Sequence, residues 1–317
     1  MDEAPLLLVM LGNLGAVLGA ARMAGNVLHW RWLNGRGLRV GAALDAVFLS
    51  RFAMLAVVIG SFWLGVHAVI AFFAAVSVVA LRQFMTAAGV SPGDDAHARS
   101  DRLLHVAVIL VQYALVSSRA YALFSVCIPL ASALLLPILS LCGRSERRPL
   151  DCIAKRHWAI MLCVYCVSCA PALLMLEIPG FAGKNALLLI FFVVVTQAAD
   201  VCERLVSRLR GPTAPAHKSM RACTLERCVG RGAGAIAAGC ALCALTPFPM
   251  LVAGAMGLAL ALSGLLGITV MAAIRRDSQF KTRGLPLAAR SETMDRLGCL
   301  CFSAPVLLQL THFLYAA

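Results

Sequence analysis

MAAIRRDSQFKTRGLPLAARSETMDRLGCLCFSAPVLLQLTH, residues 271–312, is the stretch that decides what kind of protein this is. It places a dense group of Arg, Lys and Asp residues between two apolar runs, 250–274 and 297–316. Each run is long enough to cross the hydrocarbon core of a bilayer. A charged segment held against lipid in this way is suited to binding phosphate groups, so we treat 271–312 as the candidate functional segment.

The whole chain is too apolar for a water-soluble protein. Of its 317 residues, 61% are hydrophobic and only 14% are charged. Apolar runs that can span a membrane are predicted at 5–28, 43–63, 66–86, 103–118, 120–141, 158–177, 185–202, 229–247, 250–274 and 297–316. The fold class is therefore predicted to be all-α: a polytopic integral membrane helical bundle of about 8–10 transmembrane helices, with residues 1–317 forming a single transmembrane domain.

The basic residues are distributed as this topology requires. If the spans alternate in direction, only Arg119 and Lys184 of the 28 Lys and Arg residues fall on one side of the membrane. The other side carries long basic connections, among them 204–231 and 275–296. The positive-inside rule makes these connections cytoplasmic. The net charge of +13 thus reflects topology and attraction to anionic lipid, and nucleic-acid binding is not predicted.

Asp200 is an ionisable residue at the end of the apolar run 185–202. Such residues are costly in a membrane helix and are candidates for function. In an alternative interpretation, Asp200 has reached the interface and pairs with Arg204 one turn later. Asn185, at the start of the same run, is predicted to cap the helix.

Several motifs of the chain resemble the phosphatidate cytidylyltransferases, the CTP-dependent enzymes that make CDP-diacylglycerol. Arg275-Arg276 stands where that family has Lys-Arg, and Lys281 where it has the Lys of Lys-Asp. Asp295-Arg296 stands at the family's Asp-Arg, and Gln197-x-x-Asp200-Val201 is a further matching motif. The resemblance covers residues 70–317. It implies that the chain is a diverged bacterial member of that family.

The resemblance implies transfer of the cytidylyl group of CTP to phosphatidate, giving CDP-diacylglycerol and diphosphate in phospholipid biosynthesis. Asp295 and Lys281 are then the catalytic candidates, and Asp295 and Asp200 the candidate Mg²⁺ ligands. The candidate phosphate-binding residues are Arg275, Arg276, Arg296 and Thr224. Cations are needed because the reaction brings two polyanions together. The expected partners are CTP, phosphatidate and membrane lipids; a homodimer is compatible with the sequence, and the expected location is the bacterial inner membrane.

The chain departs from the family pattern at several charged or flexible positions. Ala272 replaces a Ser, Thr282 an Asp, Arg290-Ser291-Glu292 a His-Gly-Gly, Gly298 the last Asp of Asp-Arg-x-Asp, and Ile268 an Asp that many members carry. The family's Ser-Pro-x-Lys-Thr-x-Glu-Gly reads as residues 220–227, which keep only Thr224 and Glu226 and end in Arg227.

These departures leave three hypotheses. The first is an active cytidylyltransferase, with an eroded signature that reduces activity or changes the substrate. The second is a non-catalytic membrane paralogue that binds lipid or a partner enzyme. The third is a secondary transporter, suggested by the ten spans and Asp200, although the two halves show no matching broken helices in the sequence.

Overall fold

A computed structural model describes residues 65–87, 95–141, 149–181, 183–209, 220–277 and 287–315. All of these belong to one compact unit, Val57–Ala317. Residues 1–64, with the predicted spans 5–28 and 43–63, lie outside the described residues, so the prediction of a single domain over 1–317 is not tested. The described residues form helices and contain no strand, which confirms the all-α fold class.

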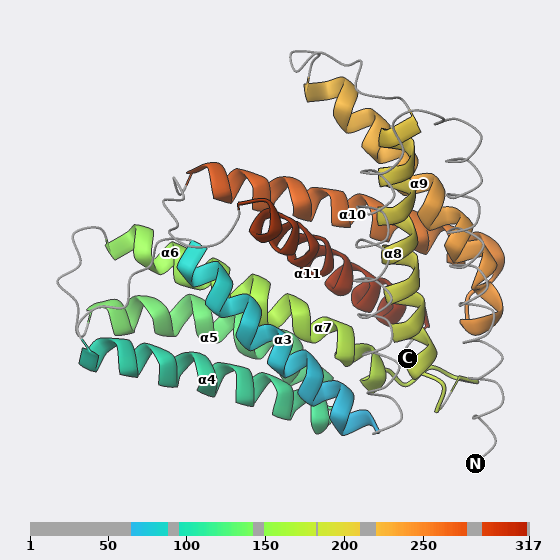
Figure 1. The fold of residues 1–317 in the computed structure, drawn as a ribbon. Helices are drawn as coiled ribbons and strands as arrows, with labels where there is room; N and C mark the ends of the chain where they lie inside the picture. The colour runs from blue at the N-terminus through green and yellow to red at the C-terminus, as the bar shows by residue number, and fades with distance from the viewer. Residues whose placement is uncertain are drawn as a thin grey trace. The chain divides into compact units, whose positions relative to one another are not determined.

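Nine α-helices make up the described part of the chain (Figure 1). They are α3 (Val66–Ala87), α4 (Asp95–Ser117), α5 (Tyr121–Leu141), α6 (Pro149–Ile160), α7 (Val167–Ala172), α8 (Ala186–Leu209), α9 (Met220–Ala241), α10 (Met250–Asp277) and α11 (Leu287–Tyr315). A π-helical turn, Met161–Cys166, joins α6 to α7. A 3₁₀ turn, Leu173–Met175, extends α7, and another, Cys243–Leu245, follows α9.

Six helical stretches in the described residues are long and apolar enough to cross a bilayer. They are Val66–Met85, Tyr121–Ile138, Cys152–Met175, Ala186–Val206, Met250–Ile274 and Arg296–Tyr315, and each overlaps a predicted span. A shorter apolar stretch, Leu103–Ser117, lies in α4. The predicted span 229–247 differs, because α9 begins at Met220 and is not among the six. The chain is an integral membrane protein.

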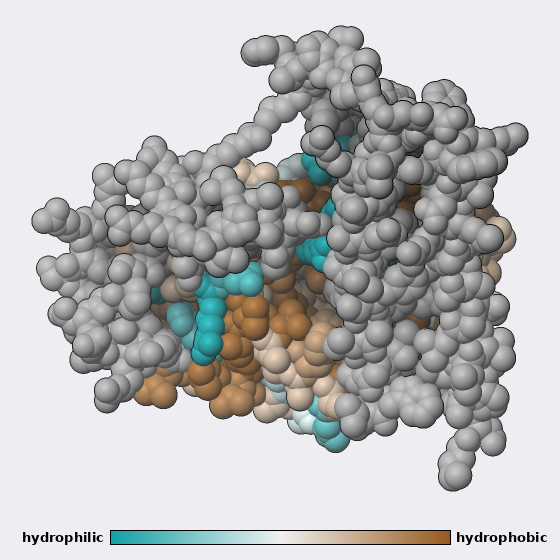
Figure 2. All heavy atoms as spheres, in the orientation of Figure 1, coloured by the Kyte–Doolittle hydropathy of each residue, from teal (hydrophilic) through white to brown (hydrophobic). Residues whose placement is uncertain are grey.

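An apolar surface covers the outside of α5. Its exposed side chains include Leu123, Val126, Leu130, Leu134 and Ile138, which recur every three or four residues and therefore lie on one face of the helix. Figure 2 shows that much of the described surface on its visible face is apolar. Lipid is as apolar as these side chains, so such a face is stable in a bilayer and not in water.

The helices of the second half pack in chain order. α8 lies along α9, α9 along α10, and α10 along α11. α11 also contacts α7 and the π-helical turn, so it connects these helices to those of the first half (Figure 1). At the crossing of α10 and α11, a Cβ on Gly267 would lie 2.0 Å from the carbonyl oxygen of Gly298. Only glycine allows the two backbones to approach this closely.

The connection before α8 is held by the side chain of Asn185. Its Nδ2 donates hydrogen bonds to the carbonyl oxygens of Leu174, at 3.3 Å, and Leu176, at 2.5 Å. Oδ1, the atom that would cap α8, is buried without a hydrogen-bond partner. Asn185 therefore stands at the predicted position just before the helix, but the prediction that it caps the helix is wrong.

Asn185→Ala is expected to lower the free energy of unfolding by about 1 to 2 kcal/mol, because two carbonyl groups lose their donor. Asn185→Asp is expected to cost more at neutral pH, since a carboxylate of the same shape would face the same two oxygens. Unfolding in an SDS titration, followed by circular dichroism, measures both effects. An Asp variant as stable as the wild type would contradict this role of the amide.

Candidate functional site

Helix α8 presents two carboxylates inside its apolar stretch. Asp200 and Glu203 are three residues apart, so they lie on one side of the helix, within the candidate span Ala186–Val206. Their side chains are only 17% and 10% exposed. One turn earlier, the hydroxyl of Thr196 donates to the carbonyl oxygen of Phe192, at 2.8 Å. Charges at this depth are costly unless they are paired, so their partners decide what the site can do.

The partners come from α9. Arg231 donates through Nη1 to Oδ1 of Asp200 and, at 2.8 Å, to Oε2 of Glu203. Arg227, one turn before Arg231, donates through Nε to Oε1 of Glu203, at 2.5 Å. We call Asp200, Glu203, Arg227 and Arg231 the carboxylate–arginine cluster. Each oxygen of Glu203 thus accepts a hydrogen bond from a different arginine.

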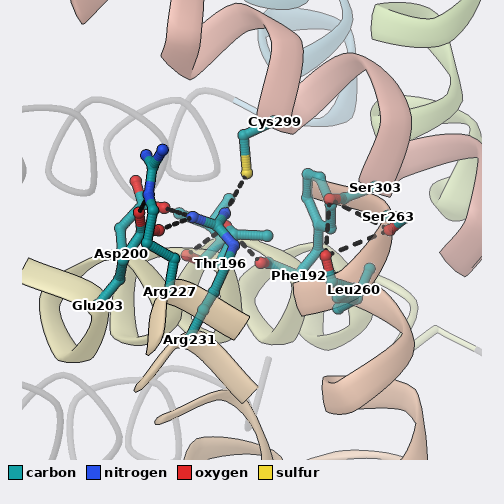
Figure 3. A network of polar contacts seen from close by, with 11 residues as sticks. Phe192, Thr196, Asp200, Glu203, Arg227, Arg231, Leu260, Ser263, Cys299 and Ser303 are labelled. Carbon is teal, nitrogen blue, oxygen red and sulfur yellow. Dashed lines mark hydrogen bonds and ion pairs between the residues drawn. The ribbon is translucent and has the colours of Figure 1, made fainter. Parts of the chain in front are cut away.

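Helices α10 and α11 complete the surroundings of Arg231. Its Nη2 donates to Sγ of Cys299, in α11. In α10, a Cβ on Gly264 would lie 2.8 Å from Sγ of Cys299 and 3.0 Å from Nη2 of Arg231, so the missing side chain makes room for the guanidinium. Figure 3 shows this group between the carboxylates of α8 and the thiol of α11. Arg231 is only 1% exposed and contacts three helices.

Glycines in α9 let this helix approach α8 closely at the cluster. A Cβ on Gly230 would lie 3.0 Å from Cβ of Val206, and one on Gly234 would lie 2.5 Å from Cβ of Cys202. These two glycines therefore let α9 lie directly against α8 on either side of Arg231. Arg231 was assigned from the sequence to the basic connection 204–231. That assignment was wrong, because Arg231 lies in the middle of α9, which already begins at Met220.

The charges of the cluster balance. Two carboxylates face two guanidinium groups, and a guanidinium stays protonated at any physiological pH. Arg227 is 41% exposed on its side chain, whereas Arg231 is almost fully enclosed. Removal of Arg231 would therefore take one buried cation away from two largely buried carboxylates. The cluster is an ion-pair network between α8 and α9, and the hydrogen bond from Arg231 to Cys299 links it to α11.

The predicted site residues fall into three groups. Asp200 is in the cluster, and Arg296, partly buried, lies in α11. Thr224, Arg275, Arg276 and Asp295 lie in α9, α10 and α11, but the structure does not describe their side chains. Lys281 lies outside the described residues. The assignment of catalytic and phosphate-binding roles to these residues is untested. Asp200 is paired with Arg231 of α9, and its pairing with Arg204 in the alternative interpretation stays a prediction.

Helix geometry nevertheless relates Asp295 to the cluster. Asp295 precedes Cys299 by four residues, which is one turn and about 6 Å along the axis of α11. Asp200, Arg231, Gly264 and Cys299 lie about three turns from Leu209, Met220, Asp277 and Leu287, the helix ends that flank the two basic connections. The segments that carry most of the predicted residues therefore extend from the cluster toward those ends.

The described residues do not fit Mg²⁺ at Asp200. Mg²⁺ requires oxygen ligands, of which protein carboxylates usually supply one or two. Here Oδ1 of Asp200 and both oxygens of Glu203 accept hydrogen bonds from arginines. Within the described ranges, no group of three or more His, Cys, Asp or Glu residues is arranged to hold a metal ion. Asp200 as a metal ligand therefore stays a prediction that the observed ion pairs do not favour.

A comparison with known families decides the identity of the chain. The profile of the Cytidylyltransferase family matches residues 46–314. The chain belongs to the cytidylyltransferase family. It is also 28% identical over 297 residues to a protein of Escherichia coli (strain K12) named "Uncharacterized protein YnbB", covering 93% of this chain and 95% of that one. The predicted similar region, 70–317, lies almost wholly within the family match.

The structure explains one departure from the family pattern, at Gly298 in α11. Where the cytidylyltransferase signature ends in Asp, Gly298 has its Cβ position 2.7 Å from the carbonyl oxygen of Gly267 and 2.7 Å from Cγ of Met271. A carboxylate side chain has no room there. Ile268, next to Gly267, replaces the other Asp. In this member, close packing of α10 against α11 therefore occupies position 298, where the family signature has a carboxylate.

Glu203, Arg227, Arg231 and Cys299 are the residues that sequence reasoning missed. A signal for two pairs was present: Asp200 and Glu203 three residues apart, and Arg227 and Arg231 four residues apart, are each on one side of a helix. Opposite charges on consecutive helices favour pairing. Assigning all basic residues of 204–231 to a connection concealed that signal.

Proposed function

We propose that the protein is a phosphatidate cytidylyltransferase, or a close functional variant of one. A phosphate oxygen of phosphatidate attacks the α-phosphorus of CTP. The bond from that phosphorus to the bridging oxygen of the β-phosphate breaks, and diphosphate leaves with the electron pair. The product is CDP-diacylglycerol. Membership of the cytidylyltransferase family over residues 46–314 is the observation that carries this proposal.

The geometry supports a site beside the cluster, toward the ends of α8 to α11. Ionisable residues inside membrane helices are functional candidates, and the cluster places such residues where four helices meet. In the proposal, Arg275, Arg276, Lys281 and Arg296 bind the phosphates of CTP and phosphatidate, and Thr224 assists them. Arginine suits bidentate binding of phosphate oxygens, and lysine supplies a point charge.

Asp295 is the carboxylate left for the divalent cation in this proposal. Mg²⁺ would neutralise phosphate charge as diphosphate leaves. The proposed location is the bacterial inner membrane, with the connections after α8 and α10 in the cytoplasm, where soluble CTP meets a membrane lipid. A homodimer is compatible with this arrangement, and the proposed reaction does not depend on it.

Incorporation of label from CTP into lipid tests the proposal. Purified protein in liposomes that contain phosphatidate is expected to convert α-³²P-labelled CTP into label extractable by organic solvent, in a reaction that requires Mg²⁺. Asp295→Ala is expected to reduce the rate at least about 100-fold, because the cation that stabilises the charge of the transition state loses its carboxylate ligand. Glu177→Ala, at an exposed acidic residue before α8, is the matched control and should retain the wild-type rate.

A non-catalytic paralogue is the second candidate, and two observations favour it. Arg231 already neutralises Asp200, and the crossing of α10 and α11 leaves no space for the family's Asp at position 298. This candidate requires that folded wild-type protein incorporates no label with any phosphatidate supplied. Complementation of a bacterial strain that lacks its own cytidylyltransferase would exclude it.

A further inference from the structure

The carboxylate–arginine cluster has the form of a cation site whose cation belongs to the chain itself. Two carboxylates on one side of α8 converge on a single positive group, as they would on a bound ion. The positive group is the guanidinium of Arg231, 1% exposed. Gly264 supplies the space for it, and its Nη2 is directed at Cys299. The position of the guanidinium is therefore built by all four helices α8 to α11.

We propose that Arg231 is an internal cation that takes the place of a divalent metal ion between Asp200 and Glu203. While Arg231 is present, these two carboxylates bind no metal. Without it, they become a divalent-cation site. This inference goes beyond the proposed function, since it concerns what occupies the carboxylates and holds whether or not the protein turns over CTP.

Charge explains why a guanidinium and a metal ion exclude each other here. A divalent cation at Asp200 would lie within a few ångströms of Arg231, in surroundings where repulsion between like charges is poorly screened. Arg231 cannot relieve this by losing its proton. It also cannot move easily, because leaving Asp200 would mean withdrawing a buried guanidinium from its hydrogen bonds to α8 and α11. A metal ion would have to displace the side chain completely.

Arg227 reinforces the arrangement. It holds the second oxygen of Glu203 at 2.5 Å, so that carboxylate has no oxygen without an arginine partner. In the alignment with the family motif, Arg227 stands where the family has the Gly that follows Glu. A glycine there could not make this contact. The side chain of Arg227 is 41% exposed, so this side of the cluster is open to solutes once Arg231 is removed.

Mn²⁺ binding to the full-length protein in detergent tests the proposal. Electron paramagnetic resonance reports free Mn²⁺, so bound Mn²⁺ per chain follows by difference. The wild type, Asp200→Asn and Glu203→Gln are expected to bind Mn²⁺ equally. Arg231→Ala is expected to gain one Mn²⁺ per chain, with a dissociation constant on the order of 10⁻⁴ to 10⁻³ M, typical of a site with few carboxylates. The double variant Arg231→Ala/Asp200→Asn should lose it again.

Thermal unfolding gives an independent readout. Mn²⁺ is expected to raise the melting temperature of Arg231→Ala by several degrees, because a ligand that binds only the folded state stabilises it. The same rise should be missing from Arg231→Lys, which retains a cation, and from Arg231→Ala/Asp200→Asn. Arg227→Ala is the matched control: it removes an arginine from the same helix but leaves Arg231, so no site should be gained.

Two results would overturn the proposal. One is that Asp200→Asn binds less Mn²⁺ than the wild type, since the carboxylate of Asp200 would then hold metal beside Arg231. The other is a folded Arg231→Ala that gains no Mn²⁺. If Arg231→Ala folds only when Mn²⁺ is present, the proposal is supported. If Arg231→Ala never folds, the comparison of Mn²⁺ binding by the wild type, Asp200→Asn and Glu203→Gln decides. Failure to incorporate CTP would count against the proposed function and leave each of these measurements unaffected.

Discussion

Arg231→Met is expected to lower the free energy of unfolding by about 3 to 5 kcal/mol, the usual cost of leaving one side of a buried ion pair without its partner. Met fills much of the same volume, so the loss is one of charge rather than packing. The carboxylates of Asp200 and Glu203 are only 17% and 10% exposed and would both lose the guanidinium of Arg231, while Glu203 would retain Arg227. Unfolding in an SDS titration measures the difference.

Two controls separate charge from burial in this experiment. Arg227→Met removes an arginine of the same cluster whose side chain is 41% exposed, so it should cost less than about 1 kcal/mol. The triple variant Asp200→Asn/Glu203→Gln/Arg231→Met has no charge to compensate at these three positions and should recover most of the lost stability. A triple variant as unstable as Arg231→Met would show that packing, not charge, causes the loss.

Gly267→Ala is expected to destabilise the fold by about 3 kcal/mol, at the upper end of overpacking. The new Cβ would lie 2.0 Å from the carbonyl oxygen and 2.7 Å from the carbonyl carbon of Gly298, and both are backbone atoms of a packed helix. No rotamer change relieves a backbone contact, so α10 and α11 must separate. Helix separation also moves Gly264, which lies one turn earlier beside Arg231.

Gly232→Ala is the matched control for Gly267→Ala. Its Cβ would meet Cδ1 of Leu258 at 3.4 Å, an ordinary van der Waals contact. Because alanine favours helix more than glycine by about 1 kcal/mol, this variant should be neutral or slightly stabilised. Gly298→Asp, which restores the residue of the family signature, is expected to behave like Gly267→Ala and yield no gain in CTP incorporation. Equal stability of the Gly267 and Gly232 variants would contradict the close crossing.

The sequence by itself determined the fold class and most of the spans. Apolar runs of bilayer length have few alternatives, because a backbone in lipid must satisfy its own hydrogen bonds as helix. The runs 66–86, 185–202 and 250–274 accordingly appear as helical stretches with nearly the same bounds. The motifs of 271–312 also identified the cytidylyltransferase family, since they are local and need no knowledge of contacts.

Only the tertiary structure decided the partners of the charges. Asp200 and Arg231 are 31 residues apart in the chain, and Arg231 and Cys299 are 68 apart. Which of several basic residues becomes buried between the helices depends on small residues that let one helix approach another. Gly230, Gly234 and Gly264 make room for Arg231, and a rule that counts charges per connection does not detect them. The pattern of apolar residues along the sequence determines which segments avoid water. The pairing of buried charges is determined by how closely the packed helices fit together.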